Sequence, residues 1–335
     1  MGKVTSLEVA EKAGVSRSAV SRVFTPGASV SKRTADKVRQ AAAQLGYRPN
    51  VLARSLITGR SRIIGLVVAY LENQFYPEAI ERLSKALQAE GYHVLVFMAS
   101  NDHEATQSVI DELLDYQVDA IVAASVGLSN DLTDRCEGLG IPIVLFNRHQ
   151  YDDRLSSVTS DNVAGGRKLA EFLVAGGHRR IAHIAGWEGA STQIDRETGF
   201  VAGLKDAGQT LYARAAGDFN FEKARAAARE MFSGTERPDA VFVANDHMAF
   251  AVMDVLRFEL GLRVPQDVSV VGYDDVALAC WPSYDLTTVR QPANRMVAET
   301  VSVLLDRLSD RETAPRRIAL DGPLMIRGSA RTAKE

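Results

Sequence analysis

Short runs of apolar, mostly β-branched residues alternate with longer amphipathic stretches from residue 62 onward. A first series comprises residues 63–69, 78–89, 93–99, 104–116, 120–126, 132–139 and 143–146, and a second comprises 180–185, 193–207, 224–232, 240–244, 248–260 and 268–272. Strands that alternate with helices form parallel sheets, because right-handed crossovers return each helix onto the sheet. The pattern therefore predicts an α/β fold with two lobes, each built on a doubly wound parallel sheet.

Composition places the chain among ordinary globular proteins. It has 335 residues, 46% hydrophobic and 24% charged, and no apolar run approaches the ~18 residues of a membrane helix. The amino terminus lacks the apolar stretch of a secretory signal, so we expect a cytoplasmic protein without a membrane partner. Cys136 and Cys280 cannot supply a disulfide framework or a four-ligand zinc site between them, and we interpret both as small buried residues.

Charge is distributed unevenly along the sequence. Residues 1–60 contain eleven basic and three acidic residues, a net charge of +8, which leaves −11 for the remainder. A basic head on an acidic body attracts phosphate at one end only. A solvated basic surface would give the same count, so the charge alone does not decide between the two interpretations.

The basic segment carries the signals of short helices. Thr5 and Glu8 have the spacing of a capping box, Gly14 supplies a left-handed stop, and Ser16 can cap a second helix over residues 17–24. The inward side chains of these two helices are expected to be Val9, Ala10, Ala13, Val20 and Val23. Two short helices around one glycine predict a helix-turn-helix.

A third helix completes this small core. Ser31 caps it and Gly46 ends it, with Val38, Ala41, Ala42 and Leu45 at helical spacing between them.

The outward face of the second helix holds the candidate DNA-reading residues. These are Arg17, Ser18, Ser21 and Arg22. An arginine at this place can bond guanine O6 and N7 together, and a serine can contact a base or a phosphate. Two solvated arginines on a surface helix are the simpler alternative. Thr5, Ser16 and Asn50 are further candidates for DNA contact.

The segments VTSLEVAEKAGVSRSAVSRVF, VSKRTADKV, LGYRPN and LARSL resemble the lactose/galactose repressor family. The resemblance implies that residues 51–57 form a hinge helix that orders on operator DNA, paired across a homodimer. It also makes Leu56 a candidate wedge in the minor groove, although packing between hinge and core would equally suit an apolar residue. The implied domains are a DNA-binding domain over 1–48, a hinge over 49–60 and a sensing core over 61–335. Within the core, the first lobe takes about 61–160 and 292–320, and the second about 161–291 and 321–330.

Polar side chains follow several predicted strands, where ligands bind in parallel sheets. Asn73, Phe75 and Tyr76 follow the first strand, and Arg148 follows residues 143–146. Later strands are followed by Asn245 with Asp246 and by Asp274 with Asp275. A helix cap is the competing interpretation for Asp161 and Asp246.

The family resemblance continues through SDNVAGGRKLAEFLVAGGHRRIAHIAG, RETGFVAGL, VANDHMAFAVM, VSVVGYDD and LTTVRQP. It implies a core similar to periplasmic sugar-binding proteins. Arg196, Asn245 and Asp274 would then clamp a small-molecule effector, and Phe75, Tyr76 and Phe219 would form apolar walls. Gln291 would lie near the cleft on a return strand.

Arg148 bears on the charge of the effector. It adds a second guanidinium beside Arg196, which favours an anionic ligand such as a sugar acid or a sugar phosphate. Pairing of Arg148 with Asp161 or Asp274 would remove that preference.

Two other classes of protein fit a two-lobed α/β core, namely a small-metabolite enzyme and a sugar-binding protein. The sequence has no P-loop, no GxGxxG after a strand and no GxSxG, and its histidines lack metal-ligand spacing. We therefore expect no enzyme activity, cofactor or metal. The basic head favours a DNA-binding regulator, most simply a repressor, over a sugar-binding protein. No leucine-rich heptads follow Gly328, so the resemblance predicts a homodimer without a tetramerising tail.

Overall fold

The computed structural model describes residues 4–25, 28–48, 60–99 and 103–333. The chain divides into two compact units, Met1–Ser61 and Arg62–Glu335. The predicted hinge over residues 51–57, with Leu56, and the candidate contact Asn50 lie outside the described residues. No helix in the described ranges could span a lipid bilayer.

The first unit contains three helices in its described part: α1 (Ser6–Ala13), α2 (Arg17–Val23) and α3 (Lys32–Leu45). The predicted caps are confirmed. Thr5 and Glu8 form both halves of the capping box, Ser16 and Ser31 cap α2 and α3, and Gly14 and Gly46 end α1 and α3 with φ of 64° and 69°. The helices pack around a core of Val9, Ala10, Ala13, Val20, Val38, Ala41 and Ala42. The capping residues thus set where each helix begins or ends, and the helical spacing of the apolar residues sets which side chains form the core.

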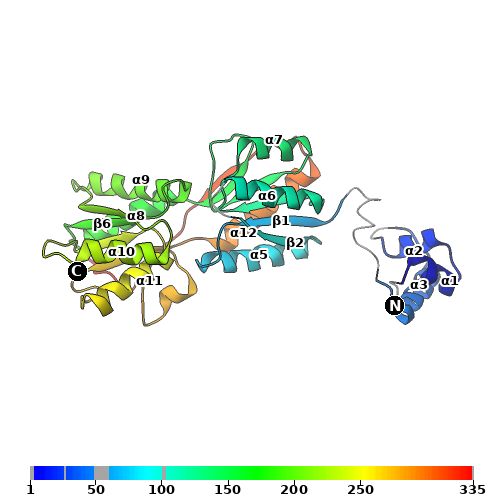
Figure 1. The fold of residues 1–335 in the computed structure, drawn as a ribbon, viewed down its shortest axis with the longest axis horizontal. Coiled ribbons are helices and arrows are strands. Elements are labelled where there is room, and N and C mark those ends of the chain that lie inside the picture. Colours follow the sequence, from blue (N-terminus) through cyan, green and yellow to red (C-terminus); the bar gives the residue numbers. More distant parts are fainter. Residues whose placement is uncertain (1–3, 26–27, 49–59, 100–102, 334–335) are drawn as a thin grey trace. The chain divides into compact units, whose positions relative to one another are not determined.

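The first lobe of the second unit is a parallel sheet with strand order β11-β5-β4-β3-β1-β2. The strands are β1 (Ile63–Val68), β2 (His93–Met98), β3 (Ala120–Ala124), β4 (Ile143–Phe146), β5 (Ser156–Ser160) and β11 (Arg317–Leu320). The helices are α5 (Phe75–Ala89), α6 (His103–Asp115), α7 (Asn130–Gly138) and α12 (Ala293–Ser309). Figure 1 shows α6 and α7 on one face of the sheet and α5 and α12 on the other.

The second lobe repeats this architecture with strand order β12-β10-β9-β8-β6-β7, in which only the β10–β12 pair is antiparallel. Its strands are β6 (Ile181–Ala185), β7 (Ala213–Ala216), β8 (Ala240–Val243), β9 (Ser269–Asp274), β10 (Thr287–Arg290) and β12 (Leu324–Met325). Its helices are α8 (Asn162–Ala175), α9 (Ser191–Asp206), α10 (Phe221–Phe232) and α11 (Asp246–Asp254). The prediction of two doubly wound α/β lobes is confirmed.

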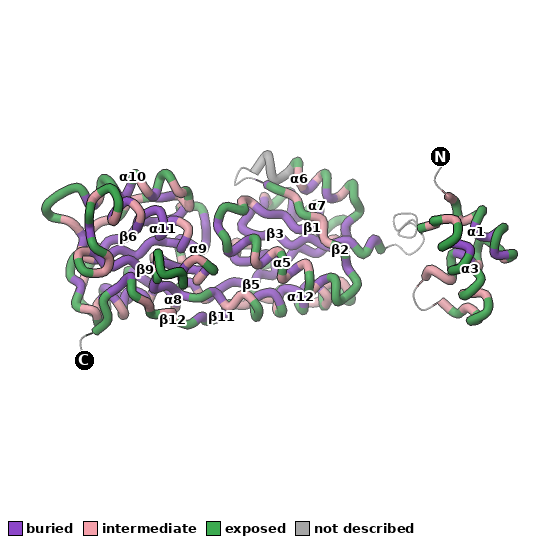
Figure 2. Tube along the Cα trace, turned by 90° about the horizontal axis from the view of Figure 1, so that it is seen from below, coloured by how far each residue is buried: buried purple, intermediate pink, exposed green. Residues whose placement is uncertain are grey.

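Burial follows the layers, with buried strands inside each lobe and exposed residues on the outer helix faces (Figure 2). The chain passes from one sheet to the other after β5, β10 and β11.

Some local expectations differ from the structure. The helix expected over 248–260 begins at Asp246 and changes to a π-helical turn over Val255–Glu259. Cys136 is buried as expected, whereas Cys280 is exposed, because it lies on the surface 3-10 turn Ala277–Cys280 rather than under a helix.

Candidate functional site

The predicted DNA-reading residues share one surface of the first unit. Arg17, Ser18, Ser21 and Arg22 are all exposed on α2. The guanidinium of Arg17 is oriented by α1, since its Nε donates a hydrogen bond to Ser6 Oγ over 3.0 Å. Ser6 was not singled out by the sequence, because the bond joins the first turns of two separate helices.

The two capping hydroxyls have local partners. The Thr5 backbone N–H donates to Glu8 Oε2 over 2.6 Å and the Thr5 hydroxyl donates to it over 2.9 Å, and these two hydrogen bonds lower the pKa of Glu8. Ser16 Oγ accepts from the Ala19 N–H and lies 2.9 Å from Ser18 Oγ. In this structure both hydroxyls therefore serve to start helices.

In the second unit, four side chains predicted from separate motifs meet at Asp274, at the carboxyl end of β9. Asp274 Oδ1 accepts hydrogen bonds from Gln291 Nε2 over 2.7 Å and from Arg196 Nη2 over 3.3 Å. Its Oδ2 accepts from Asn73 Nδ2 over 2.9 Å. Asn73 follows β1 in the first lobe, whereas the other three belong to the second lobe. We call these four residues the Asp274 cluster, and it joins the lobes by a direct hydrogen bond.

Arg196 is the buried cation of the Asp274 cluster. Only 2% of it is exposed, its Nε donates to Asn162 Oδ1 over 2.9 Å, and its Nη1 donates to the Ala244 carbonyl over 2.7 Å. Its guanidinium also lies 3.7 Å from the centre of the Tyr273 ring. These contacts fix the fork of Arg196 and, through it, the position of the Asp274 carboxylate.

Burial changes the acidity of two carboxyls in this region. It raises the pKa of Asp274, an effect that the Arg196 guanidinium opposes. It raises the pKa of Asp246 well above its usual range, and the nearby Asp274 adds to that shift. Asp246 accepts hydrogen bonds from Thr288 Oγ1 and from the Val276 N–H, so it connects β10 with the segment that follows β9.

The structure shows which of the polar residues at the strand ends cap helices. Asp161 caps α8 by accepting from the Ala164 N–H. Asp246 does not cap α11, because Asn245 does so with its Oδ1, which accepts from the Met248 N–H over 3.0 Å. This orientation leaves the buried Asn245 Nδ2 without a hydrogen-bond partner among the described residues.

The predicted apolar walls come from both lobes. Phe75 and Tyr76 begin α5, and Phe75 stacks on Phe146 with ring centres 6.2 Å apart. The Tyr76 hydroxyl accepts from Asn147 Nδ2 over 2.8 Å. In the second lobe Phe219 lies so close to Gly186 that any side chain at position 186 would overlap its ring.

Arg148 and Trp187, which are far apart in the sequence, are in contact in the structure. The Arg148 guanidinium lies 5.5 Å from the centre of the Trp187 ring, a cation–π arrangement. Trp187 was missed by sequence reasoning, as was His149, whose backbone N–H donates to Ser191 Oγ and whose Nε2 lies 2.9 Å from Asp195 Oδ2. Neither has a local pattern that identifies it, because each partner lies 39 to 46 positions away.

A cavity of about 460 Å³ adjoins the Asp274 cluster, and its lining includes Phe75, Asp274 and Gln291. The cavity borders the cluster at Asp274 and Gln291, whereas Arg148, Phe219 and Asn245 are not part of its lining.

Comparison with known proteins gives a consistent result. A family model described as bacterial regulatory proteins, lacI family, matches residues 6–50, and one described as periplasmic binding protein-like domain matches residues 170–330. The HTH-type transcriptional regulator CelR of Thermobifida fusca is 35% identical over 334 residues, which cover 96% of each chain.

Two solved structures extend the likeness. A transcriptional regulator CelR–cellobiose complex is 32% identical with a TM-score of 0.74, covering 98% of this chain and 100% of that chain. The Lac repressor dimer bound to operator and the anti-inducer ONPF is 28% identical with a TM-score of 0.88, covering 98% and 99%. The chain belongs to the lacI family of bacterial regulatory proteins, and it is a DNA-binding transcription regulator rather than an enzyme.

Proposed function

We propose that this protein is a repressor that binds a pseudo-palindromic operator as a homodimer, and that a sugar-like effector bound between its lobes controls operator affinity. The observation that carries the proposal is the Asp274 cluster, in which Asn73 of the first lobe bonds directly to the second. A ligand that inserts at this bond alters the contact between the lobes, and relative movement of two lobes is a common way to transmit binding. The solved complex of the CelR regulator contains cellobiose, which supports a carbohydrate in such a cleft.

The orientations of two amides favour a hydroxylated ligand. Asn245 uses its oxygen to cap α11 and so presents a donor, its Nδ2. Gln291 directs its Nε2 to the Asp274 carboxylate and so presents an acceptor, its Oε1. A hydroxyl both donates and accepts, so it satisfies either group, whereas an anionic oxygen only accepts.

Arg148 supports an acidic group on the same ligand. It is 5% exposed and lies against Trp187, so its charge is presented in a region with little competing water. Arg196 bonds to Asp274, Asn162 and the Ala244 carbonyl. We therefore infer a sugar acid or a sugar phosphate, with its hydroxyls toward Asn245 and Gln291 and its anion toward Arg148.

A thermal-shift panel tests this assignment. Neutral sugars, sugar acids and sugar phosphates are added to the full chain at matched concentrations, and unfolding temperatures are compared. A ligand present at 100 times its Kd is expected to stabilise the protein by about 2.7 kcal/mol. We expect acidic sugars to give the larger shifts and Arg148→Ala to reduce them to those of the neutral sugars. Stabilisation by neutral sugars alone would exclude the anionic effector but retain a carbohydrate.

Operator recognition is tested by Arg17→Ala. We expect this substitution to cost roughly 1–3 kcal/mol of specific binding and to relax base preference at one position in each half-site. Binding to the operator and to a scrambled duplex is measured across a salt series. Ser6→Ala is the matched variant, since it removes the hydrogen bond that orients Arg17 but keeps the guanidinium. An equal loss on both duplexes would make Arg17 a phosphate contact.

Apolar residues on the surface of the second unit support a homodimer. The edge strand β2 exposes Val96 and Met98, at 46% and 48%, and the second lobe exposes Phe258 and Trp281, at 81% and 54%. Val96 and Met98 are two residues apart and so share one face of β2, and an apolar patch on an edge strand is typical of an association surface. The similar Lac repressor was solved as a dimer on its operator.

A further inference from the structure

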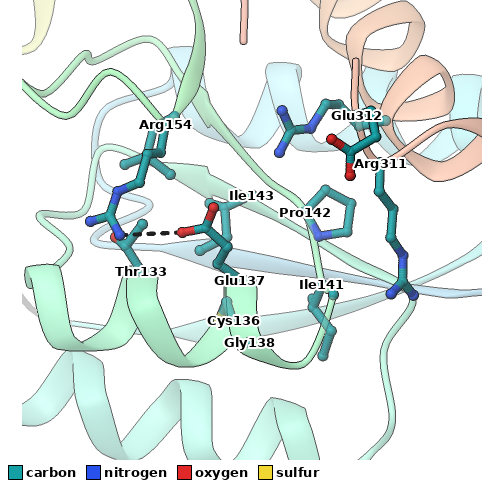
Figure 3. A pocket seen from close by; sticks show the side chains of 13 residues that line it. Thr133, Cys136, Glu137, Gly138, Ile141, Pro142, Ile143, Arg154, Arg311 and Glu312 are labelled. Atoms are coloured by element: carbon teal, nitrogen blue, oxygen red, sulfur yellow. Dashed lines mark hydrogen bonds and ion pairs between the residues drawn. The ribbon is translucent and has the colours of Figure 1, made fainter. Parts of the chain in front are cut away.

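A second pocket lies at the opposite end of the first lobe from the Asp274 cluster. It has a volume of about 260 Å³ and is formed by the end of α7, the loop before β4, the turn at Arg154 and the end of α12 with Arg311 and Glu312. Ile143 begins β4, so the pocket is at the amino ends of the strands, whereas the cluster is at their carboxyl ends. Figure 3 shows Arg154 and Glu137 on one side of it and Arg311 on the other.

The inner wall of the pocket is apolar and uncharged. Leu155, Ile143 and Cys136 line it and are 4%, 7% and 0% exposed. Burial raises the pKa of the Cys136 thiol to about 11, so the thiol remains neutral at physiological pH. Pro142 adds a further buried surface beside them. This wall suits the apolar body of a ligand rather than a sugar ring.

Three arginines and two glutamates line the pocket. Arg154 pairs with Asp152 over 2.7 Å, with Glu137 over 3.2 Å and with Asp134, so acidic groups outnumber basic ones on its side of the pocket. Arg307 and Arg311 differ from it, because within the part of the chain that the structure describes neither forms an ion pair. Arg307 Nη1 donates instead to the Thr313 carbonyl. The Glu312 carboxylate is the one acidic group of the lining that is not paired with Arg154.

The backbone makes room for the Arg311 guanidinium. Gly140 has a φ of +67°, in the left-handed region, and a Cβ at this position would overlap Arg311 Nη1. The absence of a side chain at position 140 leaves space for the end of the Arg311 side chain at the edge of the pocket.

We propose that this pocket binds a small carboxylate with an aromatic or branched apolar body, at a site separate from the effector cleft. The carboxylate pairs with Arg311 and Arg307, and the apolar body covers Ile143 and Leu155. A volume of about 260 Å³ limits the ligand to a single ring or a short branched chain. A guanidinium fork binds a carboxylate through two parallel hydrogen bonds, which gives the pocket its preference for a planar acid.

The test uses 4-fluorophenylacetate as probe and its uncharged analogue 4-fluorophenylacetamide as control, with fluorine NMR on the full chain. We expect saturable line broadening of the acid, with a Kd on the order of 1 mM for a ligand of this size, and none for the amide. Arg311→Ala is expected to weaken binding by about fivefold, the upper range for a partly exposed ion pair.

Arg295→Ala is the matched control, because Arg295 is an exposed arginine at the other end of α12 and does not line this pocket. It should leave the Kd of the acid unchanged. Equal binding of acid and amide, or equal weakening by Arg295→Ala and Arg311→Ala, would overturn the proposal. Because Arg311 is exposed, its loss should leave the circular dichroism spectrum and operator binding intact, which separates loss of the site from loss of the fold.

Discussion

Replacing Arg196 with alanine is expected to lower the free energy of unfolding of the second unit by ~3–5 kcal/mol, as measured by urea denaturation. Arg196 is 2% exposed and hydrogen-bonds to Asp274, Asn162 and the Ala244 carbonyl. Its removal leaves the Asp274 carboxylate buried without its positive partner and leaves two other acceptors unsatisfied. The penalty therefore comes from the groups that stay behind.

Two further variants separate this effect from a general loss of charge. Arg214→Ala removes an arginine that is 35% exposed and pairs with Glu197 and Glu188, so it should cost at most ~1 kcal/mol. Arg196→Ala combined with Asp274→Ala should cost less than the sum of the single changes, because neither charge remains alone. If Arg196→Ala is no more costly than Arg214→Ala, the Asp274 cluster does not stabilise the unit.

Hydrophobic periodicity predicted most of the fold but missed strands of a particular kind. β5 has the sequence Ser-Ser-Val-Thr-Ser, and all five residues are buried. Two of its hydroxyls have partners in the structure: Ser156 Oγ accepts from the Arg316 N–H, and Ser160 Oγ lies 3.1 Å from Tyr273 Oη of the second lobe. A polar side chain that has a hydrogen-bond partner can be buried at little cost in free energy. A buried strand made of such residues therefore shows no apolar run in the sequence, and β5 was not predicted.

The sequence named the four residues of the Asp274 cluster but not the hydrogen bonds between them. The ends of β1 and β9 identified Asn73 and Asp274 because parallel strands direct their carboxyl ends to one edge. Their mutual hydrogen bond joins positions 201 residues apart, and no local pattern encodes such a pairing. The same holds for Arg148 and Trp187, whose contact depends on how the two lobes meet.

Asp274→Ala is expected to abolish the response of operator binding to the effector while leaving operator affinity without effector within about threefold. Asp274 is the only described residue that accepts hydrogen bonds from Asn73, Arg196 and Gln291 together. Without it the first lobe loses its direct bond to the cluster, and a ligand no longer changes that contact. A ligand shifts a two-state equilibrium only by its difference in affinity for the two states, so removing that difference removes the response. Operator binding is titrated with and without the ligand that gives the largest thermal shift.

Asp275→Ala provides the control, since it also removes a buried carboxylate. The Asp275 side chain is 4% exposed, but it pairs with Arg290 and Arg327 and not with the cluster. It should keep the effector response. Asp274→Asn keeps the volume and one acceptor oxygen of the side chain, so it separates loss of the charge from a packing defect. If all three variants respond to the effector at the concentration that half-saturates the unmodified protein, Asp274 is not the group through which the ligand acts. A response lost in both Asp274 variants and kept in Asp275→Ala assigns the coupling between the lobes to this single carboxylate.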